Sequence, residues 1–404
     1  MLRQKSLPKL PFWSIPMIYA VVAVVLGLIF PHLEYRYLAG YNHRMTVSAA
    51  TAVFSAAASC MLAFMAIVFA LVFVIVPFGS TYSAELVLWL SRDPIVWHVL
   101  GIVTTTFLFA LVALGWMDRN GSGQVPFFLT WTVIILLIAC VMVLACLVQR
   151  LMIHRVTGML NFVSRKGRQV IDTVYPSLTA EPTRQRLEKS PNAHMPTPPV
   201  TQTVSHTGPP MVIAAYNVSV LVSRARQAGG VIIMSYAVGD TLFEGDTLLS
   251  LSGGQFALPE AALSRAVELQ MERTFDQDPK YALRLLVDIA IKALSPVIND
   301  PATAVQALDH IENLLRRIAS RRLEVGQAWD RDGVLRLSFP TPKWEDFLML
   351  AFDELRFYGE TSLQVMRRLR TALVDLARTV PPDKQEPVRR YIAQLDTIAV
   401  LPTC

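Results

Sequence analysis

Four long apolar runs in the first 150 residues constrain this chain more than any other feature of its sequence. They cover residues 14–30, 47–77, 97–117 and 127–148, and they contain no Asp, Glu, Lys or Arg. A helix needs about 20 apolar residues to cross about 30 Å of hydrocarbon, because each residue adds about 1.5 Å. We therefore expect a membrane α-helical domain of four transmembrane helices in residues 1–150. A signal peptide is the alternative for the first run, but no small-residue cleavage site follows it.

Basic residues next to these runs predict their orientation, because Lys and Arg favour the cytoplasmic side of a membrane. Three precede the first run, at Arg3, Lys5 and Lys9. Five follow the fourth run, at Arg150, Arg155, Arg165, Lys166 and Arg168. The two connections on the opposite side carry only Arg36, Arg44 and Arg119. We expect a multi-pass protein of the bacterial inner membrane with both termini in the cytoplasm.

The apolar runs also bear on transport. An ion-coupled transporter usually keeps an ionisable residue in the membrane despite a cost of at least about 2.5 kcal/mol, and these runs have none. The second run opens with Ser, Ala and Thr at residues 48–59, and small residues every three or four positions let helices approach closely. Two interpretations stay open: packing within the bundle or between subunits of a homo-oligomer, and a pore lined by hydroxyl groups.

Residues 151–210 are predicted to connect the membrane domain to a cytoplasmic part. Residues 154–175 have the pattern of a helix with one basic side, which suits the surface of an anionic leaflet. Eight of the 25 prolines then fall within residues 176–210, among Ser, Thr and Gln. Such a composition cannot bury a core, so we expect an extended linker.

A small β-rich subdomain is expected at residues 211–256. Strand patterns occupy 211–216 and 231–236, and a short helix capped by Asn217 lies between them. The segment VGDTLFEGDTLLSL at 238–251 predicts a hairpin-like pair of strands. It resembles the small β-barrels of biotinyl carriers, although the carriers' lysine between two methionines is missing. We interpret the subdomain as a scaffold, with a small ligand-binding barrel as the alternative.

Residues 257–404 are predicted to form a mostly α-helical subdomain, which makes the cytoplasmic part α+β. Helical patterns cover 259–273, 279–294, 301–319, 344–358, 361–379 and 383–399, and one strand pattern covers 334–339. The helix at 279–294 is apolar on almost every side, so it belongs in the middle of its domain. Its polar residues are spaced by four, four and three positions and form one seam, at Arg284, Asp288, Lys292 and Ser295.

A turn is expected after this central helix, because Pro296 ends it. Asp300 is suited to be the N-cap of the next helix, and Pro301 to be its first residue. The whole stretch resembles a bacterial family of predicted membrane proteins, known as a domain of unknown function. The resemblance lies in LVDIA, ALSP and INDP within 286–301, and extends to Arg273-Thr274, Asp278, Thr303-Ala304 and AFDELRFYG at 351–359. Val297 stands where the family pattern has glycine. The resemblance implies this architecture and an inner-membrane location, and it implies no reaction.

The seam and the turn supply the candidate ligand-binding residues, which are Arg284, Asp288, Lys292, Ser295, Asn299, Asp300 and Thr303. Oxygen ligands that converge on a turn between two helices can hold Mg²⁺ or Ca²⁺, or position a water for hydrolysis. The structural alternative is that Asp288 is compensated within its own helix by Arg284 and Lys292, each four residues away. Asp288 is then expected to be largely buried, and Asp300 to cap a helix.

No motif identifies a reaction, because phosphate-binding loops, HExxH, GxSxG and CxxC pairs are all missing from the sequence. No cofactor is expected, and the net charge of +6 fits basic residues beside a bilayer better than a nucleic-acid surface. We expect an oligomeric channel or a membrane-anchored sensor whose cytoplasmic domain binds a ligand, more readily than an enzyme. The alternative is a membrane-tethered metal-dependent hydrolase that uses the acidic turn at 288–303.

Overall fold

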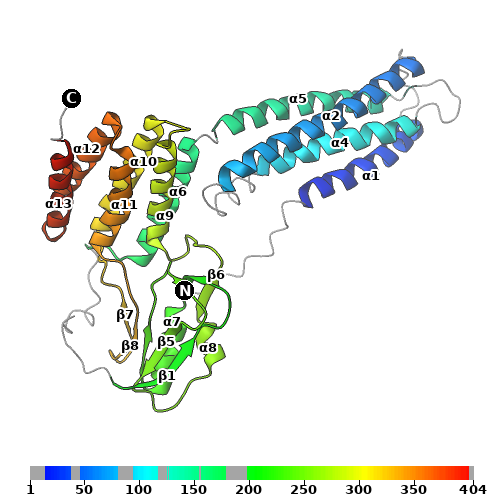
Figure 1. Cartoon of the computed structure of the whole chain (residues 1–404). Coiled ribbons are helices and arrows are strands. Elements are labelled where there is room, and N and C mark those ends of the chain that lie inside the picture. Colours follow the sequence, from blue (N-terminus) through cyan, green and yellow to red (C-terminus); the bar gives the residue numbers. More distant parts are fainter. Residues whose placement is uncertain are drawn as a thin grey trace. The chain divides into compact units, whose positions relative to one another are not determined.

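The computed structural model describes residues 14–37, 46–80, 94–116, 125, 127–153, 156–178 and 198–399. The chain divides into two compact units, Met1–Arg155 and Val156–Cys404, and each is described by itself (Figure 1). Residues 81–93 of the predicted connection at 78–96 and most of the proline-rich linker, residues 179–197, lie outside the described residues.

The first unit consists, in its described part, of α1 (Ser14–Tyr37), α2 (Val47–Ser80), α4 (Pro94–Trp116) and α5 (Phe127–Ile153). Three of these helices are long and apolar enough to cross a membrane, over Val47–Ala70, Ile95–Gly115 and Phe127–Leu147. The apolar segment of α1, Ser14–Phe30, is shorter. The membrane-protein prediction is therefore confirmed with three helices of spanning length and one shorter apolar helix.

Helix α4 packs against α1, α2 and α5. Small residues permit the close approach: a Cβ added to Gly101 would lie 2.8 Å from the ring of Tyr19 on α1. Glu34, near the end of α1, is buried and accepts hydrogen bonds from the backbone of Phe128 and Leu129 at 2.8 and 3.2 Å. This carboxylate therefore caps the amino-terminal end of α5.

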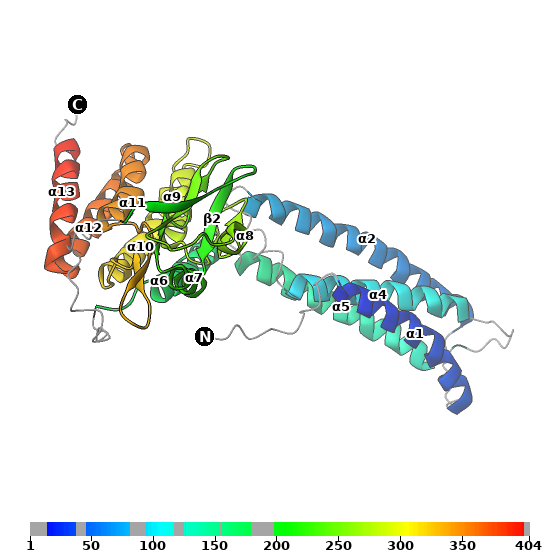
Figure 2. The ribbon, with the colours of Figure 1, turned by 90° about the horizontal axis from the view of Figure 1, so that it is seen from below.

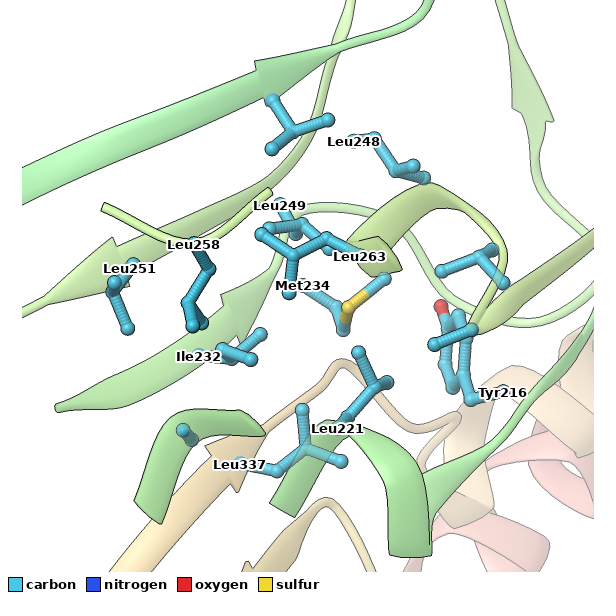
Figure 3. Packing of buried hydrophobic residues seen from close by; sticks show 14 of the residues in the cluster. Tyr216, Leu221, Ile232, Met234, Leu248, Leu249, Leu251, Leu258, Leu263 and Leu337 are labelled. Carbon is cyan, nitrogen blue, oxygen red and sulfur yellow. The ribbon is translucent and has the colours of Figure 1, made fainter. Parts of the chain in front are cut away.

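The second unit contains two sheets. The five-stranded sheet has the order β1-β5-β3-β8-β7, from β1 (Val200–Ser205), β5 (Thr247–Ser252), β3 (Val231–Met234), β8 (Leu335–Ser338) and β7 (Gln327–Trp329). The three-stranded sheet has the order β4-β2-β6, from β4 (Thr241–Leu242), β2 (Met211–Tyr216) and β6 (Val267–Gln270). Helices α7 (Val218–Ala228) and α8 (Glu260–Ser264) pack on them around one apolar core, shown in Figure 3. Asn217 caps α7, as predicted.

Three predictions for this β-rich part are wrong. Residues 238–251 do not form a hairpin, because β4 pairs with β2 whereas β5 pairs with β1 and β3. The predicted helix at 259–273 is the short α8 followed by β6, because β2 offers an edge on which 267–270 can pair. The β-rich part begins at β1, inside the predicted linker, because the Val and Thr residues of 200–205 pair with β5.

A layer of helices covers the rest of the second unit: α6 (Val156–Val174), α9 (Pro279–Ala293), α10 (Pro301–Ala319), α11 (Trp344–Gly359), α12 (Leu363–Thr379) and α13 (Pro382–Ala399). Helix α9 packs against α6, α10 and α11 and buries ten of its 15 residues, as the sequence predicted for a central helix. Helices α12 and α13 lie on the side away from α6 (Figures 1 and 2). The five helices predicted after residue 278 agree with α9–α13 within two residues at each end.

Helix α6 packs as part of this layer, against α9 and α10. Its apolar side chains Leu160, Val163 and Ile171 are fully buried. A Cβ on Gly167 would lie 2.7 Å from that of Ala282, so α6 and α9 are in close contact there. The sequence showed the basic side of this helix, and the structure shows that its apolar side is covered by α9 and α10.

Candidate functional site

The polar seam of α9 forms an ion-pair chain with α11. Arg284 lies 2.7 Å from Asp288 (Nη2–Oδ1) and also makes a two-pronged contact with Glu354, whose Oε2 lies 3.1 Å from Nη2. The Asp288 side chain remains 35% exposed, so the prediction of a largely buried carboxylate is wrong although its pairing with Arg284 is confirmed. Partial desolvation raises the pKa of Asp288, and the Arg284 charge opposes that rise.

The turn between α9 and α10 uses its polar groups internally. Asp300 caps α10 by accepting from Thr303, at 3.1 Å from the backbone nitrogen and 2.6 Å from the hydroxyl. These bonds hold the pKa of Asp300 below its usual range. The backbone carbonyl of Ser295 accepts from Ile298 and Asn299 at 3.1 and 2.9 Å. Asn299 takes the left-handed conformation, with φ of 44°, so the tight point of the turn lies at an asparagine and not at Val297.

The predicted site residues therefore form two groups along α9. Arg284 and Asp288 pair in the middle of the helix, whereas Ser295, Asn299, Asp300 and Thr303 build the turn beyond its end. Lys292 lies in the last turn of α9, between the groups. Within the described residues, no group of three or more His, Cys, Asp or Glu side chains is placed to hold a metal ion.

A buried carboxylate at the start of α9, Asp278, joins the β-rich part to the helices. Asp278 is 2% exposed, caps α9 through the backbone nitrogens of Lys280 and Tyr281, and accepts from Arg273 Nε at 2.8 Å. Gly239, in the loop before β4, lies over this pair: a Cβ there would lie 2.4 Å from Asp278 Oδ2. Burial raises the pKa of Asp278, and Arg273 acts in the opposite direction. Asp278-Pro279 repeats the Asp300-Pro301 capping signal, which is how the sequence could have revealed it.

The polar face of α10 makes hydrogen bonds and ion pairs with α6, although Gln306 and Asn313 on this face stay exposed. Asp172 on α6 accepts from Arg317 Nε at 2.6 Å and from Arg321 Nη2 at 2.5 Å. Arg168 donates to Asn313 at 3.3 Å on the same face. These contacts join positions about 145 residues apart in the sequence, so no local sequence pattern predicts them.

The second unit also has a cavity of about 550 Å³ between the β7–β8 strands and the starts of α11 and α13. Its walls include Gln327, Phe339, Lys343, Trp344, Asp383 and Lys384. The Lys384 ammonium is buried and donates to the carbonyls of Ala319 and Arg321, both at 2.9 Å. Desolvation lowers the pKa of this lysine. A cavity of this size with a few convergent polar groups is typical of small-molecule sites.

Comparisons with known proteins agree that this is a membrane protein. Residues 9–375 match the family described as predicted membrane protein (DUF2254). An uncharacterized protein of Mycobacterium bovis and one of Mycobacterium tuberculosis are each 27% identical over 338 residues, which is 80% of this chain and 62% of the relative. The chain thus spans less than two thirds of the length of these curated relatives. No solved structure matches the chain. Because the family match covers nearly the whole sequence, the chain belongs to the DUF2254 family of predicted membrane proteins.

Proposed function

We propose that this protein is an oligomeric channel or a membrane-anchored sensor of the inner membrane, in which a cytoplasmic second unit binds a ligand and acts on the membrane helices. The observation that carries the proposal is the relation between α5 and α6. Helix α5 ends at Ile153 and α6 begins at Val156, so only two residues separate them. A helix of the second unit's core is therefore joined almost directly to a helix of spanning length.

The packing of α6 makes it suitable for transmitting a change. Gly167 contacts α9 and α10, and Asp172 binds two arginines near the end of α10. Any rearrangement of α9 and α10 would displace α6, because tightly packed interfaces shift between discrete arrangements and do not deform continuously. A displacement of α6 would then act on α5 through a very short connection.

Two places in the second unit can receive a ligand within this proposal. The seam and turn from Arg284 to Thr303 form the first, because Arg284 and Asp288 are only half-buried. The second is the cavity of about 550 Å³ beside Trp344. The metal-dependent hydrolase alternative has less support, since no group of three or more His, Cys, Asp or Glu side chains among the described residues is placed to hold a metal ion.

The proposal also includes four transmembrane helices per chain and assembly of the chain into a homo-oligomer. Small residues on α2, at Ala52, Ala56, Ser59 and Ala63, are exposed in the single chain and recur every three or four positions. Such a stripe suits close packing of helices in lipid. Ala56→Leu should therefore lower the molecular mass of the protein in mild detergent, whereas Ala145→Leu, at an exposed position of α5, should leave it unchanged.

The coupling is tested by releasing α6 from α10. Asp172→Asn removes the charge that holds Arg317 and Arg321, and Arg370→Gln is the matched control because it breaks an ion pair between α12 and α13. Full-length protein in lipid nanodiscs should show faster amide hydrogen exchange at the end of α5 for Asp172→Asn only. In liposomes, the same variant should alter ion flux if the protein conducts. Identical exchange in both variants would refute the coupling.

A further inference from the structure

Five large apolar side chains are exposed at one end of the helical layer: Val297, Ile298, Phe357, Tyr358 and Leu363, here called the apolar tip. Val297 is 94% exposed and Phe357 is 72% exposed. They come from the turn between α9 and α10, the last turn of α11 and the start of α12. A soluble surface scatters such residues singly, whereas a group of them marks an interaction site.

The contributing segments lie together. A Cβ on Gly359, at the end of α11, would lie 2.8 Å from Val365 on α12 and 3.9 Å from Leu294 at the end of α9. Val297 and Ile298 follow Leu294 within four residues. Figure 1 shows these helix ends at the same end of the layer, opposite the β-rich part.

The chain enters the second unit at this end. Thr157, in the first turn of α6, donates to Gln306 of α10 at 3.2 Å, which places the start of α6 beside the early turns of α10. The spanning segment of α5 ends at Leu147, and six further helical residues add about 9 Å at about 1.5 Å each. The three peptide steps from Ile153 to Val156 reach about 10 Å at most. The start of α6 is therefore held within about 20 Å of the hydrocarbon boundary.

We propose that the apolar tip inserts into the lipid headgroup and acyl boundary of the bilayer, as a second attachment of this unit to the membrane. The short connection favours lipid as the occupant, because it keeps this end of the layer near the bilayer. The composition also fits: Tyr and Phe suit the interface, and Lys292 and Arg356 lie in the last turns of α9 and α11, where anionic headgroups would attract them. The proposal is independent of whether the protein conducts.

Photo-crosslinking of full-length protein tests this inference. A benzoylphenylalanine residue replaces either Phe357 or Phe243, which is 56% exposed and precedes β5 in the β-rich part. The two sites lie toward opposite ends of α9, which is about 22 Å long, because the loop at Gly239 contacts the start of that helix. The protein is placed in nanodiscs of phosphatidylethanolamine and phosphatidylglycerol, illuminated, and analysed by mass spectrometry.

We expect phospholipid adducts at position 357 at least five times more often than at position 243. Adding Val297→Asp and Ile298→Asp should reduce the adducts at 357 several-fold, and both changes are tolerable because these side chains are outside the core. Equal adduct yields at the two positions would overturn the proposal. A crosslink from 357 to a second copy of the chain, without lipid adducts, would overturn it as well.

Discussion

Replacing Asp278 by Ala should destabilise the second unit more than any other single change at the ends of α9. The side chain is 2% exposed, accepts two backbone N–H groups as a helix cap, and pairs with Arg273. Loss of a helix cap typically costs about 1 kcal/mol. Breaking a buried ion pair costs about 3–5 kcal/mol, and we take the lower end because Arg273 is 28% exposed. The total is about 4 kcal/mol.

The assay is thermal unfolding of full-length protein in detergent, followed by tryptophan fluorescence. For a unit of about 250 residues, 1 kcal/mol corresponds to roughly 2–4 °C, so Asp278→Ala should lower the melting temperature by roughly 8–16 °C. Asp300→Ala removes only a cap and should lower it by about 2–4 °C. Asp278→Asn keeps a cap acceptor and should fall between them. Equal losses for Asp278→Ala and Asp300→Ala would refute the reasoning.

Two further predictions concern α6 and the acid limit of stability. A Cβ on Gly167 would lie 2.7 Å from Ala282 and 3.0 Å from Leu314. Gly167→Ala should therefore lower the free energy of unfolding by about 1–3 kcal/mol in a denaturation experiment. Gly115→Ala is the control and should cost no measurable stability, because no atom lies within 4 Å of the new Cβ. The pKa values of Asp172 and Asp300 are lowered by their partners in the folded state. The unfolded chain therefore binds more protons below about pH 4, so this stabilisation is present above that pH and is lost as the pH falls through the folded values. Melting curves between pH 5 and pH 2 should fall less steeply for Asp172→Asn than for the parent, and parallel curves would contradict the assignment.

Interactions within a few residues could be predicted from the sequence. The apolar runs identified the membrane helices because crossing hydrocarbon demands an uninterrupted apolar segment. The apolar circumference of 279–294 indicated a central helix, and Asp300-Pro301 indicated where the next helix begins. The Arg284–Asp288 pair was predictable for the same reason, because an i,i+4 spacing places both side chains on one helix face.

Only the tertiary structure shows which residues and strands that are distant in the chain interact with one another. Glu354 completes the seam from 70 residues away, and Asp172 meets Arg317 across 145 residues. Strands β1 and β6 form because β5 and β2 offer them edges, although their own sequences resemble a linker and a helix. Asp278 is buried because Gly239 allows a loop to cover it. The periodicity of a sequence shows which face of a segment is apolar. It does not show which other segment will cover that face, because many apolar surfaces of about the right size could pack against it.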